Sequence, residues 1–234
     1  MFRTIKRISR NALRKSGREL TVFPLPKYLK QHRVDCILDI GANVGQYGAE
    51  VRQLGYKGRI ISFEPLSEAF LKLTELSNSD SNWTVHNIGI GSTEENLNIN
   101  IAAATSTSSF LPLRDSEVAD KNNLKYTDTE SVKVQRLDTI YNEVVGDAKS
   151  VFMKIDTQGF EYKVLEGAEE SLKSIAGIQI EVSLSKIYEG EAYIEEIIAY
   201  LRTRNFTPYW VQHGFKDPLK MQLLQADLFF FSDQ

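Results

Sequence analysis

The sequence predicts an α/β fold: an open, doubly wound, seven-stranded and mostly parallel sheet that ends in a C-terminal antiparallel hairpin. From residue 36 onward, short apolar runs alternate with helix-like segments, a pattern typical of βαβ units and parallel sheets. A glycine turn ends the first apolar run and opens a helix. The apolar runs at 208–211 and 228–231 are joined by a loop too short for a helical crossover, so they should pair antiparallel.

The first half of the predicted domain alternates regularly between strand and helix. Continuous apolar runs mark the strands, and apolar residues three and four positions apart mark the helices. Gly55 ends the first helix as a C-cap, and Pro65 follows the end of the second strand. The predicted strands lie at 36–40, 59–63 and 83–90, and the predicted helices lie at 44–54 and 67–77.

The middle of the chain departs from this alternation. Residues 91–137 are rich in Ser, Thr, Asn and Asp, which indicates an inserted β excursion with a long loop at about 104–129. Loops of this length are usually either functional or disordered, so this one is a candidate substrate lid. Alternating apolar residues at 97–101 and 132–137 predict two strands that pair with each other. Beyond the insertion, strands are predicted at 151–155 and 178–182, and helices at 160–175 and 192–204.

A chain of 234 residues with 42% hydrophobic and 25% charged residues is ordinary for one globular domain, which we place at 35–234. The chain has no run of about 18 apolar residues and no apolar core of a secretory signal at its N-terminus, so we expect a cytoplasmic protein. Cys36 is the only cysteine, which excludes an intramolecular disulfide. Its place in an apolar run predicts a small buried side chain.

Residues 1–34 form a basic N-terminal segment. Residues 1–20 contain seven Lys or Arg residues and one acidic residue, a net charge of +6, and their apolar residues recur at helical spacing. This pattern predicts an amphipathic helix that lies on the anionic inner face of a membrane. The alternative is a solvated helix whose narrow apolar stripe packs on the domain. The rest of the chain is acidic and has no basic patch, so no nucleic-acid partner is expected.

The most informative stretch is LDIGANVG at 38–45, where an apolar strand ends in a glycine turn. Ligands bind outside the carboxyl ends of the strands in an open parallel sheet, so this turn should border a ligand. Gly41 and Gly45 allow the backbone to approach that ligand closely. Asp39 would repel a pyrophosphate but attract a ligand with an amino group and a positive sulfonium. A carboxylate that only stabilises the turn is the structural alternative.

Glu64 ends the second predicted strand, 23 positions after Gly41. An acidic side chain at this point accepts hydrogen bonds from the ribose hydroxyls of an adenosine cofactor. Asn43 replaces the second glycine of the dinucleotide fingerprint, which argues against NAD. Together these features predict a site for S-adenosylmethionine (SAM) and therefore a methyltransferase. Two alternatives are an oxidoreductase that binds NAD or a nucleotide sugar, and a catalytically inactive binding protein with a methyltransferase fold.

Four short motifs carry a resemblance to a known family: DIGANVG at 39–45, FEP at 63–65, LDT at 137–139 and FMKIDTQGFE at 152–161. Over about residues 35–232 the chain resembles the FkbM-type methyltransferases, which use SAM and mainly O-methylate sugars and other hydroxyl-bearing natural products. The resemblance implies a Rossmann-like class I fold and a small-molecule or glycan acceptor. It also implies SAM contacts at Asp39, Gly41, Asn43, Gly45 and Glu64, with Asn87 at the adenine edge.

Lys154 and Asp156 lie two positions apart on a predicted strand, so their side chains share a face at its carboxyl end. An alcohol loses its proton as it attacks a methyl group, and a nearby carboxylate can accept that proton. We therefore predict Asp156 as the base beside Lys154. The structural alternative is an ion pair between the two or a cap on the helix that begins at Phe160. Glu181 ends the next strand and should face the same cleft. Both carboxylates together would suit Mg²⁺, but since no third ligand is closely spaced, we predict no metal site.

Overall fold

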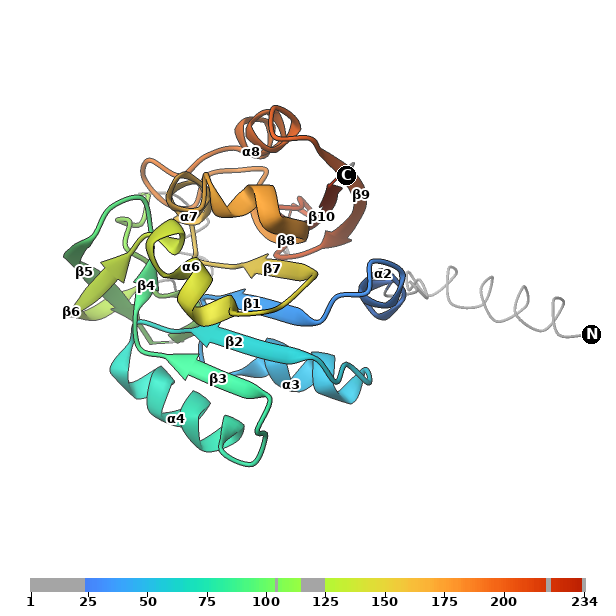
Figure 1. Cartoon of the computed structure of the whole chain (residues 1–234). Helices are drawn as coiled ribbons and strands as arrows, with labels where there is room; N and C mark the ends of the chain where they lie inside the picture. Colours follow the sequence, from blue (N-terminus) through green and yellow to red (C-terminus); the bar gives the residue numbers. More distant parts are fainter. Residues whose placement is uncertain (1–23, 104, 115–124, 218–219, 233–234) are drawn as a thin grey trace, which may run out of the picture.

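The computed structural model describes residues 24–103, 105–114, 125–217 and 220–232 of the chain (Figure 1). Within these residues, seven strands form one sheet in the order β3-β2-β1-β7-β8-β10-β9. The first five pair in parallel, and β10 pairs antiparallel with both β8 and β9, so the predicted fold class is confirmed. The strands are β1 (Cys36–Ile40), β2 (Arg59–Phe63), β3 (Trp83–His86), β7 (Val151–Ile155), β8 (Ile175–Ser183), β9 (Phe206–His213) and β10 (Gln225–Ser232).

Helices cover both faces of this sheet. Ile37 of β1 belongs to a hydrophobic cluster with Leu25 of α2 and Val51 of α3. The next residue, Leu38, belongs to a second cluster with Ile140 of α6 and Val164 of α7, because successive residues of a strand point to opposite faces. The helices are α2 (Leu25–Gln31), α3 (Gln46–Gln53), α4 (Ser67–Ser77), α6 (Leu137–Val145), α7 (Glu161–Gly167) and α8 (Ile194–Arg202).

The inserted segment builds a second sheet with the order β4-β6-β5. The predicted pairing of two strands is confirmed, because β5 (Glu95–Ala102) and β6 (Tyr126–Gln135) pair antiparallel. The predicted bounds are wrong, since β6 begins within the loop expected at about 104–129 and ends before Leu137; residues 104 and 115–124 of that candidate lid lie outside the described residues. The single strand predicted at 83–90 is wrong, because its last part is a separate strand, β4 (Gly89–Ile90), that pairs with β6. The amide of Asn87 donates hydrogen bonds to the backbone oxygens of Glu64 and Pro65 at the point where β3 ends and the chain changes sheet.

The helix predicted at 160–175 is also wrong in its extent. It ends at Gly167, and a separate 3₁₀ turn, η2 (Ser171–Ser174), follows. A carboxylate oxygen of Asp138 accepts hydrogen bonds from the backbone N–H groups of Glu170 and Ser171, so the second turn has its own N-terminal cap. Asp138 itself lies on α6, a helix that was not predicted.

The remaining predictions concern Cys36, the N-terminal segment and membrane-spanning helices. Cys36 is buried as predicted, and burial raises the pKa of its thiol to about 11. The amphipathic helix expected at 1–20 lies outside the described residues, and α2 is the part of the basic N-terminal segment that the structure describes. Within the described ranges, no helix is long and apolar enough to cross a membrane.

Candidate active site

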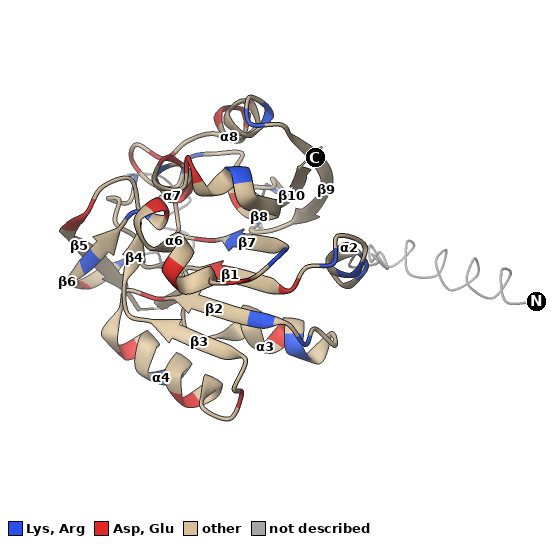
Figure 2. Ribbon diagram, viewed as in Figure 1, with Lys and Arg blue, Asp and Glu red and all other residues tan. Residues whose placement is uncertain are grey.

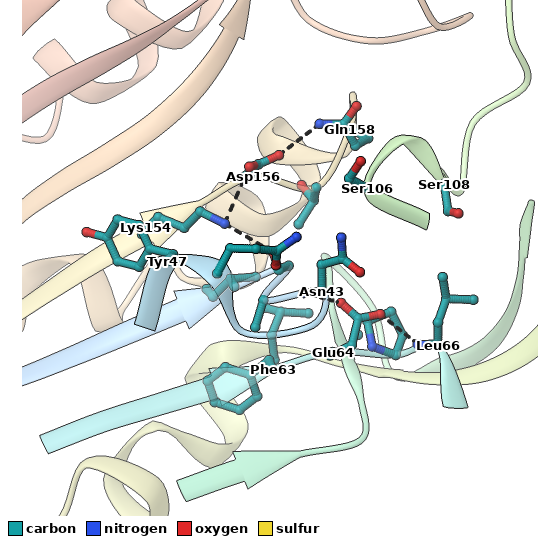
Figure 3. Close-up of a pocket in the computed structure, with 18 of the residues that line it drawn as sticks. Asn43, Tyr47, Phe63, Glu64, Leu66, Ser106, Ser108, Lys154, Asp156 and Gln158 are labelled. Atoms are coloured by element: carbon teal, nitrogen blue, oxygen red, sulfur yellow. Dashed lines mark hydrogen bonds and ion pairs between the residues drawn. The ribbon is translucent and has the colours of Figure 1, made fainter. Parts of the chain in front are cut away.

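A cavity of about 320 Å³ lies at the carboxyl ends of β1, β2 and β7 (Figure 3). This volume is typical of small-molecule sites. Its walls come from segments far apart in the sequence, including the loops after β1, β2 and β7, the strand β4 and residues 105–110 of the insertion. The cavity therefore lies at the edge of the sheet where parallel α/β proteins bind their ligands.

The glycine turn after β1 forms one wall of this cavity. Gly41 and Asn43 line it, and both have positive φ angles, of 76° and 48°. A Cβ on Gly41 would lie 1.9 Å from the backbone oxygen of Asp156, so only glycine allows the turn to pack on the end of β7. Gly45 does not line the cavity. A Cβ on Gly45 would lie 2.8 Å from the side chain of Leu76, so this glycine lets the loop pack on α4 rather than contact a ligand.

Glu64 presents its carboxylate to the cavity from the end of β2. The side chain is 5% exposed, and each oxygen accepts a backbone hydrogen bond, from Asn43 N at 2.8 Å and from Leu66 N at 2.9 Å (Figure 3). Burial raises the pKa of Glu64 to about 7, although the two N–H donors oppose this shift. Each carboxylate oxygen retains a lone pair, so Glu64 can accept two further hydrogen bonds from a ligand diol.

Asp39 lies behind this wall and is fully buried. Its carboxylate accepts a hydrogen bond from Ser62 Oγ at 3.1 Å and lies 3.4 Å from Nζ of Lys154, which is its neighbour in register on β7. Lys154 Nζ also donates to the backbone oxygen of Gly41 at 3.1 Å and lies 3.5 Å from Asp156 Oδ2. Asp39 thus does not line the cavity and holds Lys154 in place instead.

The charge of Lys154 depends on these carboxylates. Burial alone would lower the pKa of Lys154, but Asp156 and Asp39 outweigh that effect and raise it. Burial raises the pKa of Asp39, and the charge of Lys154 opposes the shift. We conclude that Lys154 is a buried ammonium that ties the glycine turn, β1 and β7 together.

Asp156 lines the cavity at the carboxyl end of β7, and its side chain is 36% exposed. Its second oxygen, Oδ1, accepts a hydrogen bond from Gln158 Nε2 at 2.8 Å, and the same amide nitrogen donates to Glu181 Oε2 at 2.9 Å. Glu181 does not line the cavity, and burial followed by the charge of Asp156 raises its pKa well above the usual range. The two predicted carboxylates thus share one amide donor that lies between them.

The sequence interpretation predicted no role for Gln158, which lines the cavity, or for Tyr188, which contacts Gln158 from behind the lining. Gln158 Oε1 accepts a hydrogen bond from the Tyr188 hydroxyl at 2.9 Å, and Ser109 Oγ donates to the Gln158 backbone oxygen at 2.6 Å. Gln158 has a φ of 53°, in the left-handed region that non-glycine residues seldom adopt. A polar residue and a glycine directly after the strand that carries Asp156 were the available sequence signal.

The inserted segment contributes a second wall. Thr105 Oγ1 donates a hydrogen bond to Asn43 Oδ1 at 3.0 Å, and Phe110 packs on Phe160 with ring centroids 4.8 Å apart. Asn87 is exposed, donates its amide to backbone oxygens and does not line the cavity, unlike its neighbours Ile88 and Gly89. The adenine contact expected of Asn87 therefore stays a prediction, and the structure places its side chain outside the cavity lining.

No group of three or more His, Cys, Asp or Glu side chains is arranged to hold a metal ion in the part of the chain that the structure describes. Asp156 and Glu181, which we considered as Mg²⁺ ligands, are instead both hydrogen-bonded to Gln158.

The raised pKa of Glu64 predicts a pH-dependent stability. Its pKa is about 7 in the folded protein and 4.5 ordinarily, so its contribution to stability is present below 4.5 and is lost as the pH rises through 7. In urea unfolding of the ligand-free protein, Glu64→Gln should therefore gain stability relative to wild type between pH 5 and pH 8, by up to about 3 kcal/mol. Burial also raises the pKa of Glu161 to about 7, but this residue is present in both proteins, so its contribution cancels when their stabilities are compared. A difference in stability that does not change with pH would contradict this expectation.

Comparisons with known proteins agree with this fold. The chain resembles the methyltransferase FkbM from Methylobacillus flagellatus KT, with a TM-score of 0.55 and 15% identity over 85% of this chain and 44% of that one. It also resembles an rRNA methylase from Streptococcus thermophilus, with a TM-score of 0.51 and 10% identity over 92% of this chain and 99% of that one. The chain thus spans less than half the length of the Methylobacillus protein. At these identities the likeness shows the fold.

A search of curated proteins found no match. The family itself is identified by sequence: the model of the methyltransferase FkbM domain matches residues 39–208, from the glycine turn to β9, and thus includes all the predicted site residues. The chain belongs to the FkbM methyltransferase family.

Proposed function

We propose that this protein is a SAM-dependent methyltransferase that O-methylates a hydroxyl group of a sugar, a glycan or a related natural product. The observation that carries the proposal is Glu64: a buried carboxylate, fixed by two backbone N–H groups, that faces the cavity beside the glycine turn. This is the arrangement expected of a carboxylate that accepts hydrogen bonds from two ribose hydroxyls.

The charge of the cavity supports SAM over a dinucleotide. Among the described residues that line it, the carboxylates are Glu50, Glu64, Asp156 and Asp227, whereas Lys154 is the only Lys or Arg. Lys154 is already engaged by Asp39, Asp156 and the backbone of Gly41. A negative cavity favours a ligand with a positive sulfonium and disfavours a pyrophosphate.

Asp156 is the proposed general base. Bound SAM would supply an electrophilic methyl group on its sulfonium sulfur. The acceptor hydroxyl gives its proton to a carboxylate oxygen of Asp156 as its own oxygen forms the bond to the methyl carbon, and the electron pair of the breaking carbon–sulfur bond stays on sulfur. Lys154 and Gln158 each contact one oxygen of Asp156, and so they orient the carboxylate. Holding the acceptor oxygen in line with the methyl group accounts for much of the rate acceleration.

The proposal is tested first by binding and then by transfer. In calorimetry, wild type should bind SAM and S-adenosylhomocysteine, and NAD should not compete; tight NAD binding would instead support the oxidoreductase alternative. Transfer is then assayed with methyl-labelled SAM and glycan or metabolite extracts, with products identified by mass spectrometry as acceptors that gain one methyl group. Binding of SAM without transfer to any acceptor would support an inactive binding protein.

We also propose that the basic N-terminal segment holds the protein at the inner face of an anionic membrane, which would suit a lipid-linked acceptor. The net charge of +6 in residues 1–20 supports this, and Lys27, Lys30 and Arg33 extend the basic character onto exposed positions of α2 and the turn after it (Figure 2). Each basic residue near such a surface contributes about 1 kcal/mol at low salt.

Sedimentation with vesicles tests this contact. Wild type should sediment with anionic vesicles at low salt but not with neutral vesicles, and high salt should release it. A variant that lacks residues 1–20 should stay in the supernatant and retain its turnover of soluble acceptors. If wild type remains unbound to anionic vesicles at low salt, the proposed membrane contact is wrong.

A further inference from the structure

One flank of the cavity is used neither by the proposed adenosine contact nor by the proposed base. Tyr47 and Glu50 of α3 line it, together with three side chains from the other half of the sheet, Gln179 of β8, Gln212 of β9 and Asp227 of β10. We call these five residues the polar flank. Tyr47 also lies beside Lys154, whose Nζ is 5.6 Å from the centroid of its ring, so the flank adjoins the Lys154–Asp156 pair (Figure 3).

The polar flank contains three buried oxygen atoms without a hydrogen-bond partner, one hydroxyl oxygen and two amide oxygens that can only accept. Within the described residues, Tyr47 Oη, Gln179 Oε1 and Gln212 Oε1 are buried and have no hydrogen-bond partner. Gln179 is 5% exposed, and its amide nitrogen donates to Asp227 Oδ1 at 3.3 Å. Because a carboxylate accepts hydrogen bonds, this contact assigns the nitrogen of Gln179 and leaves its oxygen as the unpaired atom. Buried polar atoms are nearly always paired, so three together on one cavity wall point to a ligand that donates to them.

The polar flank is also negatively charged. Glu50, Asp156 and Asp227 all line the cavity, and the charges of Asp156 and Glu50 add to the rise that burial causes in the pKa of Asp227, so their negative charges disfavour one another. Lys154 opposes the shift but is itself held by Asp39, Asp156 and Gly41. A neutral hydroxyl could pair with one acceptor but would not relieve this repulsion. A compact cation with several N–H donors satisfies both the acceptors and the charge.

We propose that the polar flank is a subsite for a primary ammonium group of a bound ligand. This inference rests on the proposed function, which offers two sources of that chemistry: the amino-acid end of SAM, or an amino group on the acceptor. An ammonium has three donors and one positive charge. Its three donors match in number the carboxylate of Asp227, the amide oxygen of Gln179 and the hydroxyl oxygen of Tyr47, all of which line the cavity.

Calorimetry at low salt with two adenosine ligands tests the subsite. S-adenosylhomocysteine carries the ammonium, whereas 5′-methylthioadenosine lacks the whole amino-acid end. If the cofactor supplies the ammonium, Asp227→Asn and Gln179→Leu should each weaken S-adenosylhomocysteine binding by about tenfold or more and leave 5′-methylthioadenosine binding unchanged. Asp147→Asn is the matched control, because that side chain is 94% exposed and lies outside the cavity. Melting temperatures confirm that each variant is folded.

A second set of binding measurements tests whether the acceptor supplies the ammonium group. If the acceptor supplies the ammonium, both variants should bind S-adenosylhomocysteine like wild type, but the protein loaded with it should bind glucosamine more tightly than glucose, and Asp227→Asn should abolish that preference. The inference is overturned if the variants change neither S-adenosylhomocysteine affinity nor the preference for the amine. A wild-type protein that binds neither adenosine ligand would instead overturn the proposed function.

Discussion

Asp156→Asn is expected to lower turnover by about 10²- to 10⁴-fold, the range typical of a lost general base. Asparagine preserves the size of the side chain and can still accept the hydrogen bond from Gln158, but it cannot take the acceptor proton. Single-turnover rates with SAM and an identified acceptor would measure the loss. SAM affinity should remain near that of wild type, because Glu64 and the glycine turn, rather than Asp156, are the proposed adenosine contacts.

Other roles of Asp156 predict different results for the same variant. If Asp156 only forms an ion pair with Lys154, the variant should have a lower melting temperature and near-normal activity per folded molecule, because the substitution leaves Lys154 with one carboxylate partner fewer. A metal ligand predicts that a chelator already inactivates wild type. Asp147→Asn, which removes an exposed carboxylate, controls for the change in net charge. Near-normal turnover in a stable Asp156→Asn protein would remove this residue from the mechanism.

Glu64→Ala is expected to weaken SAM and S-adenosylhomocysteine binding by roughly 10²- to 10⁴-fold. Two charge-assisted hydrogen bonds to ribose hydroxyls would be lost, each worth about 1.5 to 3 kcal/mol. Because the pKa of Glu64 is about 7 and hydroxyl donors prefer the ionised carboxylate, wild-type affinity should also rise between pH 6 and pH 8. Calorimetry over this range measures both effects.

The alanine variant also removes the partner of two backbone N–H groups, those of Asn43 and Leu66, so the glycine turn could shift. Glu64→Gln serves as the second variant, because its amide oxygen retains one of these acceptors. Adenosine offers a smaller probe with the same ribose, and its affinity should fall in both variants. Unchanged affinity of a folded Glu64 variant for all three ligands would exclude the adenosine assignment.

The strands that position the site were predictable because their pattern is local. β1, β2 and β7 are short parallel strands, nearly all of whose residues are buried, so they appear in the sequence as continuous apolar runs with observed bounds equal to those predicted. Their carboxyl ends meet at one edge, which is why Gly41, Glu64 and Asp156 could be assigned to one cleft from their positions alone.

Contacts between segments far apart in the sequence were harder to predict. Asp39 and Asp156 both lie near strand ends, yet one is fully buried behind Lys154 and the other faces the cavity. Glu181 was expected in the cleft, but it does not line the cavity, and its carboxylate accepts a hydrogen bond from the side chain of Gln158. The helix α6 was missed although its buried residues Leu137, Ile140, Tyr141 and Val145 have helical spacing, because Leu137 also completes the alternation of the preceding strand.

The sequence by itself determined the α/β class, the succession of the central strands along the chain, the glycine turn, the acidic end of β2 and the family. Each of these depends on residues close together in the chain or on the rule that parallel strands share one ligand-binding edge. Only the tertiary structure decided which side chains reach the cavity and which lie behind it. It also brought Tyr47, Gln179, Gln212 and Asp227 from four separate elements to one wall. No local pattern records that proximity, because side-chain packing across the sheet sets it.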